Sequence, residues 1–133
     1  MRAIILDGRL GPSEIAAIHA ALDDPEQQVV WRLPSVAEII ARVSTQTGVR
    51  TSVMIGEGRG LGALRARYAV AWMGYCVAGH TLERIGRALG GRDHSTIRHA
   101  VAQAKLLRRR DPAFLMLTDG LVEYFAPTGE CAA

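Results

Sequence analysis

Residues 90–100 read GGRDHSTIRHA and crowd hydrogen-bonding side chains into one short stretch. After two glycines come five polar residues in succession: Arg92, Asp93, His94, Ser95 and Thr96. Side chains of these types form hydrogen bonds with the edges of bases in a DNA groove. The free amides at a helix N-terminus also attract phosphate. If a helix begins here, the stretch is suited to recognising nucleic acid.

The neighbouring sequence predicts two helices around this stretch. Residues 82–89 form a short helix capped by Thr81, and residues 94–110 form a longer helix capped by Asp93. The apolar face of the longer helix has helical spacing and consists of Ile97, Ala100, Val101 and Ala104. This is the helix-turn-helix pattern, in which the start of the second helix meets base edges in the major groove. The residues off the apolar face near that start are the candidate contacts: His94, Ser95, Thr96, Arg98 and His99.

Several of these residues also have a structural explanation. Asp93 is expected to cap the helix, and capping does not prevent it from reading a base. Ser95 and Thr96 can instead satisfy the free amides of the first helical turn. Gly90 and Gly91 are explained by the backbone of the turn. Both interpretations leave the polar side chains at the start of the helix.

The net charge of +3 conceals an uneven distribution. Between residues 57 and 110, ten arginines and one lysine face only three acids, a balance of +8, whereas residues 111–133 hold four acids and no base. A basic segment of this size is typical of a phosphate-binding surface, although a solvated basic face has the same composition. The charge favours a nucleic-acid partner and does not by itself establish one.

The rest of the chain is predicted to be almost entirely helical, so the expected fold class is an all-α helical bundle. Four further helices are expected, at residues 12–22, 35–47, 63–78 and 112–125. Ser35 and Glu38 form a capping box at the start of the second. The third is apolar nearly all round and should be the central helix. Residues 51–62 are expected to be a short helical turn and a glycine-rich loop, and EQQ at 26–28 a polar link. The segment AIIL near the N-terminus is either a strand or an extended arm.

Other chemistries find little support in the sequence. His94 and His99 are five residues apart on one predicted helix, which points them apart, and no zinc-ligand spacing occurs. No catalytic constellation, metal or cofactor is expected, and Cys76 is expected to fill the core. No apolar run approaches the roughly 20 residues of a membrane helix. The N-terminus reaches Asp7 too soon for a secretory signal, so a cytoplasmic protein is expected.

The run IGRALGGRDHSTIRHA, residues 85–100, resembles the signature of the DNA-binding C-terminal domain of DnaA, the bacterial replication initiator. In that family an Ile/Val-Gly pair, an apolar residue, Gly-Gly-Arg-Asp-His, Thr or Ser, Thr and Ile/Val-x-His recur in this order. The resemblance extends more weakly over residues 35–110. It implies an all-helical, TrpR-like domain whose helix-turn-helix binds the DnaA box, a short asymmetric duplex site. We expect this domain at residues 31–126, after an N-terminal extension with one helix (1–30) and before a frayed tail (127–133).

The resemblance also implies roles for individual residues. Four match the residues that read bases in the major groove: Asp93, His94, Ser95 and Thr96. Arg59 matches an arginine inserted into the minor groove, where narrow A·T-rich segments attract arginine; a solvated loop residue is the alternative. Arg65 and Arg67 match an Arg-x-Arg that contacts the DNA backbone. Arg92, Arg98 and His99, which lie beside the base readers, complete the predicted backbone contacts.

Some positions depart from the family pattern. Ser95 replaces the commoner threonine and loses a methyl group that can touch a thymine methyl, which relaxes one base preference. Ala66 replaces a common proline. The loop GEGRGLG holds one basic residue where the family usually holds several, and Tyr68 and Tyr75 stand where polar or basic contacts are common. We therefore expect weaker non-specific affinity for phosphate.

The chain contains no G-x-x-x-x-G-K-[ST] motif, so it is expected neither to bind a nucleotide nor to act as an enzyme. We predict that it binds double-stranded DNA at DnaA-box-like sites, in the cytoplasm and on the nucleoid, and regulates replication initiation or transcription. Full-length DnaA and other replication proteins are the expected protein partners, and no membrane partner is expected. The alternative is a protein-interaction module on the same fold. The presence of Asp93, His94 and Thr96 favours DNA, since a degenerate binder should have lost some of them.

Overall fold

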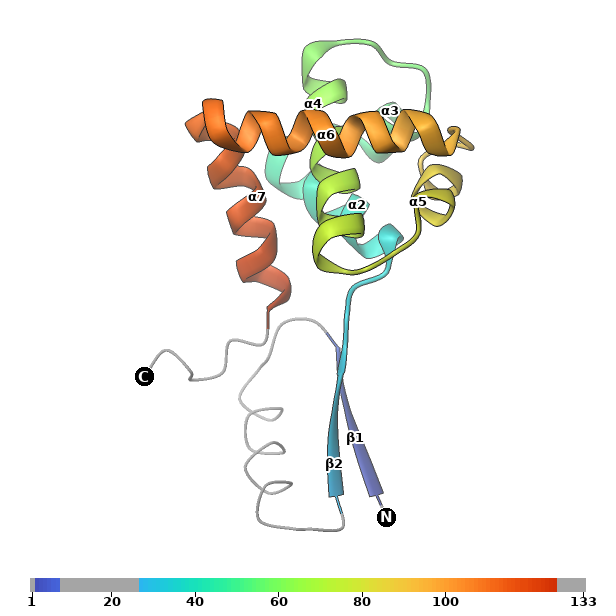
Figure 1. The fold of residues 1–133 in the computed structure, drawn as a ribbon, viewed down its shortest axis with the longest axis vertical. Coiled ribbons are helices and arrows are strands. Elements are labelled where there is room, and N and C mark those ends of the chain that lie inside the picture. Colours follow the sequence, from blue (N-terminus) through green and yellow to red (C-terminus); the bar gives the residue numbers. More distant parts are fainter. Residues whose placement is uncertain (1, 8–26, 127–133) are drawn as a thin grey trace. The chain divides into compact units, whose positions relative to one another are not determined.

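The computed structural model describes residues 2–7 and 27–126, which are drawn in colour in Figure 1. The chain divides into two compact units. The first consists of Met1–Pro34 and Glu123–Ala133, and the second of Ser35–Val122. The predicted helix at 12–22 and the predicted frayed tail at 127–133 lie outside the described residues.

In the first unit, two strands form a parallel pair. Strand β1 (Arg2–Asp7) lies beside β2 (Gln27–Arg32), with Arg2 opposite Gln27 and Asp7 opposite Arg32. The N-terminal segment that the sequence left open between strand and arm is therefore a strand. The expected polar link at 26–28 is corrected, because Gln27 and Gln28 begin β2. Its sequence continues with Val29, Val30 and Trp31, which are residue types that favour strands.

The second unit confirms the expected helical bundle with a helix-turn-helix. Its elements in chain order are α2 (Val36–Thr47), α3 (Thr51–Ile55), α4 (Leu61–Trp72), the π-helix η1 (Met73–Val77), α5 (Leu82–Ala88), α6 (His94–Arg110) and α7 (Pro112–Phe125), of which the part up to Val122 belongs to this unit. Figure 1 shows α6 as a long helix with α5 at its start and α7 at its end. None of the helices in the described part of the chain is long and apolar enough to cross a membrane.

Helix α2 begins and ends where its capping residues predict. The Ser35 hydroxyl accepts a hydrogen bond from the Glu38 amide at 3.1 Å, and the Ser35 amide donates to the Glu38 carboxylate at 2.8 Å. This reciprocal pair is the capping box expected from the sequence. Gly48 ends the helix with a φ of 79°, a conformation that glycine adopts without strain.

Helix α4 is the central helix, as its apolar composition predicts. It packs against both α2 and α6. Its buried residues are mostly small and include Ala63, Ala66, Ala69, Val70 and Ala71. Small side chains allow neighbouring helices to approach closely, so α4 can be enclosed by the rest of the bundle.

The continuation of α4 as the π-helix η1 corrects the expectation for Cys76. Its side chain was expected in the core, but Cys76 is exposed. Two residues of η1 face the bundle: Met73, which is 1% exposed, and Gly74, where a Cβ would lie 3.1 Å from Cδ1 of Ile85. Tyr75, adjacent to Gly74, is also exposed, at 45%. The π-helix therefore places Met73 and Gly74 against the bundle and leaves Tyr75 and Cys76 exposed.

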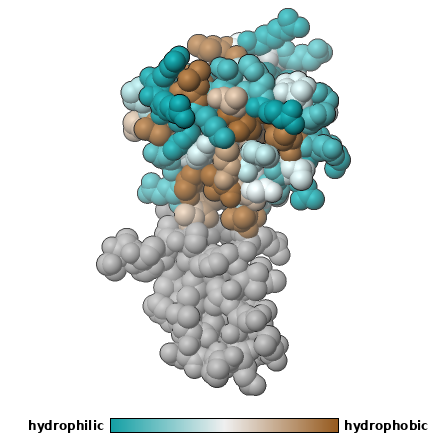
Figure 2. All heavy atoms as spheres, viewed as in Figure 1, coloured by the Kyte–Doolittle hydropathy of each residue, from teal (hydrophilic) through white to brown (hydrophobic). Residues whose placement is uncertain are grey.

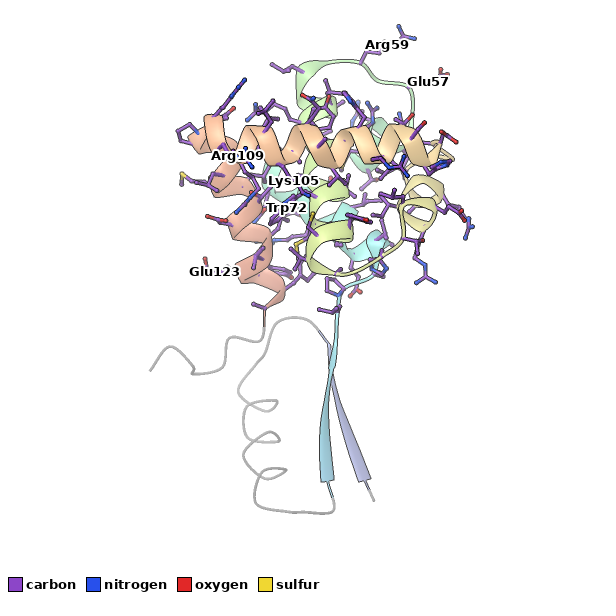
Figure 3. The ribbon with its side chains drawn as sticks, in the orientation of Figure 1. Glu57, Arg59, Trp72, Lys105, Arg109 and Glu123 are labelled. Atoms are coloured by element: carbon purple, nitrogen blue, oxygen red, sulfur yellow. The ribbon has the colours of Figure 1, made fainter. Side chains whose placement is uncertain are left out.

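Arg108 ties α6 to two other helices of the bundle. Its guanidinium lies 4.2 Å from the centroid of the Trp72 ring on α4, and Figure 3 shows Trp72 below α6. The same group donates hydrogen bonds to the Thr118 hydroxyl and to Asp119 at 3.0 Å, both on α7. The visible face of the bundle is mainly hydrophilic with scattered apolar patches (Figure 2).

Candidate nucleic-acid interface

The turn between α5 and α6 is closed by backbone contacts that require glycine. The amides of Gly91 and Arg92 both donate to the carbonyl of Gly86, at 2.9 and 2.8 Å. A Cβ at Gly86 would lie 2.2 Å from the carbonyl oxygen of Arg92. Gly90 has a φ of 87°, and a Cβ there would lie 2.2 Å from the carbonyl oxygen of Ile55. The close approach of these backbones fixes the angle at which α6 leaves the turn.

Asp93 caps α6, as predicted. Its Oδ2 accepts a hydrogen bond from the Ser95 amide at 3.1 Å and another from the Ser95 hydroxyl. The hydroxyl bond is the main reason that the pKa of Asp93 is lowered, and the amide bond is the next. The other carboxylate oxygen, Oδ1, lies 3.5 Å from Nδ1 of His94. The capping carboxylate is therefore ionised at neutral pH and keeps one oxygen directed towards His94.

The structure brings the predicted reading residues together on one exposed surface at the start of α6. The side chains of Asp93 and His94 are 64% and 54% exposed. The remaining residues of this surface are also exposed, namely Ser95, Thr96, Arg98 and His99. The opposite face of the helix is buried, with Ile97 1% exposed. The polar groups thus project from a helix that the core holds in place.

An open groove adjoins this surface and includes residues that the sequence analysis did not assign to the site. It is lined by Tyr75, Thr81, Leu82 and Glu83 together with His94 and Arg98. The middle of η1 and the start of α5 therefore line the same groove as the start of α6. For Tyr75 there was a signal, because it occupies a position where backbone contacts are common in the family that the sequence resembles.

Arg59 lies in the loop between α3 and α4 and is exposed. Figure 3 shows Glu57 and Arg59 at the loop, with their side chains directed away from the helices. The following residue, Gly60, is the N-cap of α4. Arg59 is therefore placed where it can reach a ligand outside the bundle.

Arg67, in contrast, is directed inwards and is only 8% exposed. Its Nε donates to the carbonyl of Met54 at 2.8 Å, and its Nη2 donates to those of Val53 and Gly56 at 2.9 and 3.1 Å. Burial lowers the pKa of Arg67, and the nearby charge of Arg92 lowers it further. Its contact with DNA phosphate stays a prediction, and the geometry favours an internal role.

Arg92 is bound to the same short segment of backbone. Its Nη2 donates to the carbonyl of Gly56 at 2.6 Å, and its Nη1 lies 3.3 and 3.2 Å from the carbonyls of Met54 and Ile55. Nη1 also donates to the carbonyl of Leu89. The guanidinium of Arg92 is thus bound to carbonyls within the protein, as that of Arg67 is. The predicted contact of Arg92 with DNA phosphate stays a prediction.

Arg65 is held at the junction of α6 and α7. Its guanidinium pairs with Asp111 at 2.7 Å and lies 5.5 Å from the centroid of the Phe114 ring. The bond from Arg65 is the largest cause of the lowered pKa of Asp111, to which the amides of Phe114 and Ala113 also contribute. Since the Arg65 side chain is still 27% exposed, its predicted backbone contact is compatible with this pair.

Within residues 2–7 and 27–126, no group of three or more His, Cys, Asp or Glu side chains is arranged to hold a metal ion.

Comparison with known proteins matches this region of the chain to one family. The family model described as the bacterial dnaA protein helix-turn-helix matches residues 36–103. Three similar proteins carry the name chromosomal replication initiator protein DnaA. That of Caulobacter vibrioides is 32% identical over 79 residues, which cover 59% of this chain and 16% of the relative. Those of Roseobacter denitrificans and Mycoplasma capricolum are 35% and 29% identical over 77 residues, 58% of this chain and 17% of each relative. The chain therefore spans only a small part of the length of these relatives, and the matched part contains α5, the turn and the start of α6.

Proposed function

The chain belongs to the family of the bacterial DnaA helix-turn-helix, and from this premise we propose that it binds double-stranded DNA sequence-specifically at DnaA-box-like sites. The observation that carries the proposal is the surface at the start of α6. There, exposed hydrogen-bonding side chains project from a helix whose opposite face is buried in the core. A helix-turn-helix presents this part of its second helix to base edges in the major groove.

The four reading residues have different hydrogen-bonding capacities. Asp93 uses Oδ2 for the cap and keeps Oδ1 as an acceptor, which suits the amino group of cytosine. Ser95 donates its hydroxyl proton to Asp93 and keeps its acceptor lone pairs. His94 and Thr96, which are both exposed, complete the set with donors and acceptors. The surface can therefore distinguish base pairs by the pattern of groups in the major groove.

Arg59 is proposed to enter the adjacent minor groove. The residue is exposed in the loop before α4, and arginine is attracted to the negative potential of a narrow, A·T-rich minor groove. We propose that Arg98 and His99, and Arg65 beside Asp111, contact the phosphate backbone. Such contacts position the protein without reading the sequence.

The proposed role is regulatory and independent of ATP. The chain has no nucleotide-binding P-loop motif. A protein that occupies DnaA-box-like sites without nucleotide competes with full-length DnaA for them or acts on transcription nearby. Replication initiation is then the process that it regulates.

The test is an anisotropy titration of a labelled duplex that carries a DnaA box and of a scrambled duplex, at several salt concentrations. We expect tighter binding to the box, by about a thousandfold or more if the site is fully specific. We also expect log K to fall linearly with log salt concentration, because phosphate contacts release counterions. Equal binding to both duplexes would reject sequence specificity. Binding to neither would reject the proposal and leave the protein-interaction module.

A further inference from the structure

The end of α3 is the point where two parts of the proposed DNA-binding surface meet. Helix α3 has only five residues, so the carbonyls at its C-terminal end have few partners within the helix. Four successive carbonyls at this end accept hydrogen bonds from side chains, namely those of Val53, Met54, Ile55 and Gly56. All of these bonds come from Arg67 and Arg92.

The two arginines reach this point from different elements. Arg67 lies on α4, and Arg92 lies in the turn that leads into α6. Both donate to the carbonyl of Gly56, at 3.1 and 2.6 Å. Two cations held this close repel each other, and the charge of Arg92 contributes to the lowered pKa of Arg67. The carbonyls of the α3 end offset that repulsion because their dipoles point towards both cations.

The same segment of backbone is where the loop with Arg59 begins. Gly56 is the C-cap of α3, and the exposed loop residues follow directly. On the other side, Gly90 of the helix-turn-helix turn approaches so closely that an added Cβ would meet the Ile55 carbonyl oxygen at 2.2 Å. The base of the loop is thus bound to the turn by side chains and by direct backbone approach.

We propose that Arg67 and Arg92 form a positioning pair, which fixes the loop that carries Arg59 relative to the start of α6. The inference rests on the proposed function, in which Arg59 enters the minor groove and α6 the major groove. The two grooves of one duplex lie at a fixed spacing, so the two readers must also be held at a fixed spacing. The pair acts on specificity through Arg59 and does not itself contact DNA.

The first test needs no DNA. Hydrogen exchange is measured in the free protein for the wild type, for Arg92→Lys and for Arg110→Gln, an exposed charge at the far end of α6. Lysine keeps the charge but lacks the planar set of donors that bridges several carbonyls. Arg92→Lys should accelerate exchange of the amides at 54–60 and leave those of 100–107 unchanged, whereas Arg110→Gln should change neither. Unchanged exchange at 54–60 in Arg92→Lys would overturn the proposal.

The second test is a double-mutant cycle on the box duplex. In the wild-type background, Arg59→Ala should weaken binding by about tenfold or more, the effect of losing one good groove contact. In the Arg92→Lys background the same substitution should cost less than about twofold, because the loop is no longer in place. Gly90→Ala, which disturbs the approach of the turn to the Ile55 carbonyl and leaves Arg92 in place, should have the same effect as Arg92→Lys.

The alternative, a phosphate contact by Arg92, gives the opposite pattern. Lysine would preserve such a contact, and the effects of Arg59→Ala and Arg92→Lys would multiply independently, which would overturn the positioning role. Thermal unfolding of each variant checks that it is folded. If the wild type bound neither duplex, the proposed function would fail, while the exchange experiment would still decide whether Arg92 holds the loop.

Discussion

At the start of α6, capping and recognition use different atoms of the same residues. Asp93 accepts from Ser95 with Oδ2, and its Oδ1 remains beside His94. The sequence predicts that Asp93 can cap the helix and also read a base, and the structure confirms the cap. The reading role stays a prediction. His94 makes the clearer probe, because the bonds that form the helix cap join Asp93 to Ser95.

Substitution of His94 by alanine should separate specific from non-specific binding. We expect a loss of about 1–3 kcal/mol on the box duplex and little change on scrambled DNA, because a base contact is lost and phosphate contacts remain. Thermal unfolding should be nearly unchanged, since the His94 side chain is 54% exposed. Anisotropy titrations on both duplexes provide the measurement. An equal loss on both would show that His94 does not read a base.

At the scale of the elements, Asp111 forms bonds that connect three helices, α4, α6 and α7. Its Oδ2 pairs with Arg65 at 2.7 Å, and its Oδ1 accepts from the amides of Ala113 and Phe114 at 2.9 and 3.3 Å. The carboxylate thus caps the start of α7 and pairs with Arg65 of α4, while the backbone amide of Asp111 ends α6 by donating to the carbonyl of Leu107 at 2.8 Å. These three bonds hold the start of α7, and the bonds from Arg108 to Thr118 and Asp119 hold the helix further along.

Asp111→Asn should lower the melting temperature at pH 7, and the difference from the wild type should shrink in acid. The pKa of Asp111 is lowered in the folded protein, so its contribution is fully present above the unfolded value of about 4 and is lost as the pH falls through the lower folded value. Melting curves between pH 7 and pH 2 provide the measurement. Glu57→Gln, an exposed loop charge, is the control and should show no such change. A difference that stayed constant down to the lowest pH would contradict the role of the Asp111 charge.

The elements differ in how much of them the sequence predicts. The bounds of α2 and α6 are set by local caps, such as Ser35 with Glu38, and by apolar spacing. Both features are visible in the sequence, so the sequence predicts these bounds. The roles of Arg67 and Arg92 depend on carbonyls that are 11 to 38 residues away in the chain. The sequence shows that these two residues are cations but does not show which carbonyls they contact. The exposure of Cys76 depends on the π-turn of η1, which the apolar pattern of the helix does not reveal.

For the whole chain, the residues of the proposed site all lie within the second unit, Ser35–Val122. A fragment of residues 31–126, the domain expected from the sequence, should therefore keep the helical fold and the box preference of the full chain. Circular dichroism and the two-duplex titration test this with the full chain as control. A folded fragment that lost its preference for the box would show that residues 1–30 or 127–133 take part in recognition.

The most direct measurement is selection of bound duplexes from a random-sequence pool by the full chain at physiological salt, because it presupposes no site. We expect one short asymmetric motif that resembles the DnaA box, with an A·T-rich flank. In parallel selections, Arg59→Ala should lose the preference for A·T pairs in the flank. His94→Ala should lose the preference for one base pair elsewhere in the motif. A pool that bound without enrichment of any motif would contradict sequence-specific recognition by this surface.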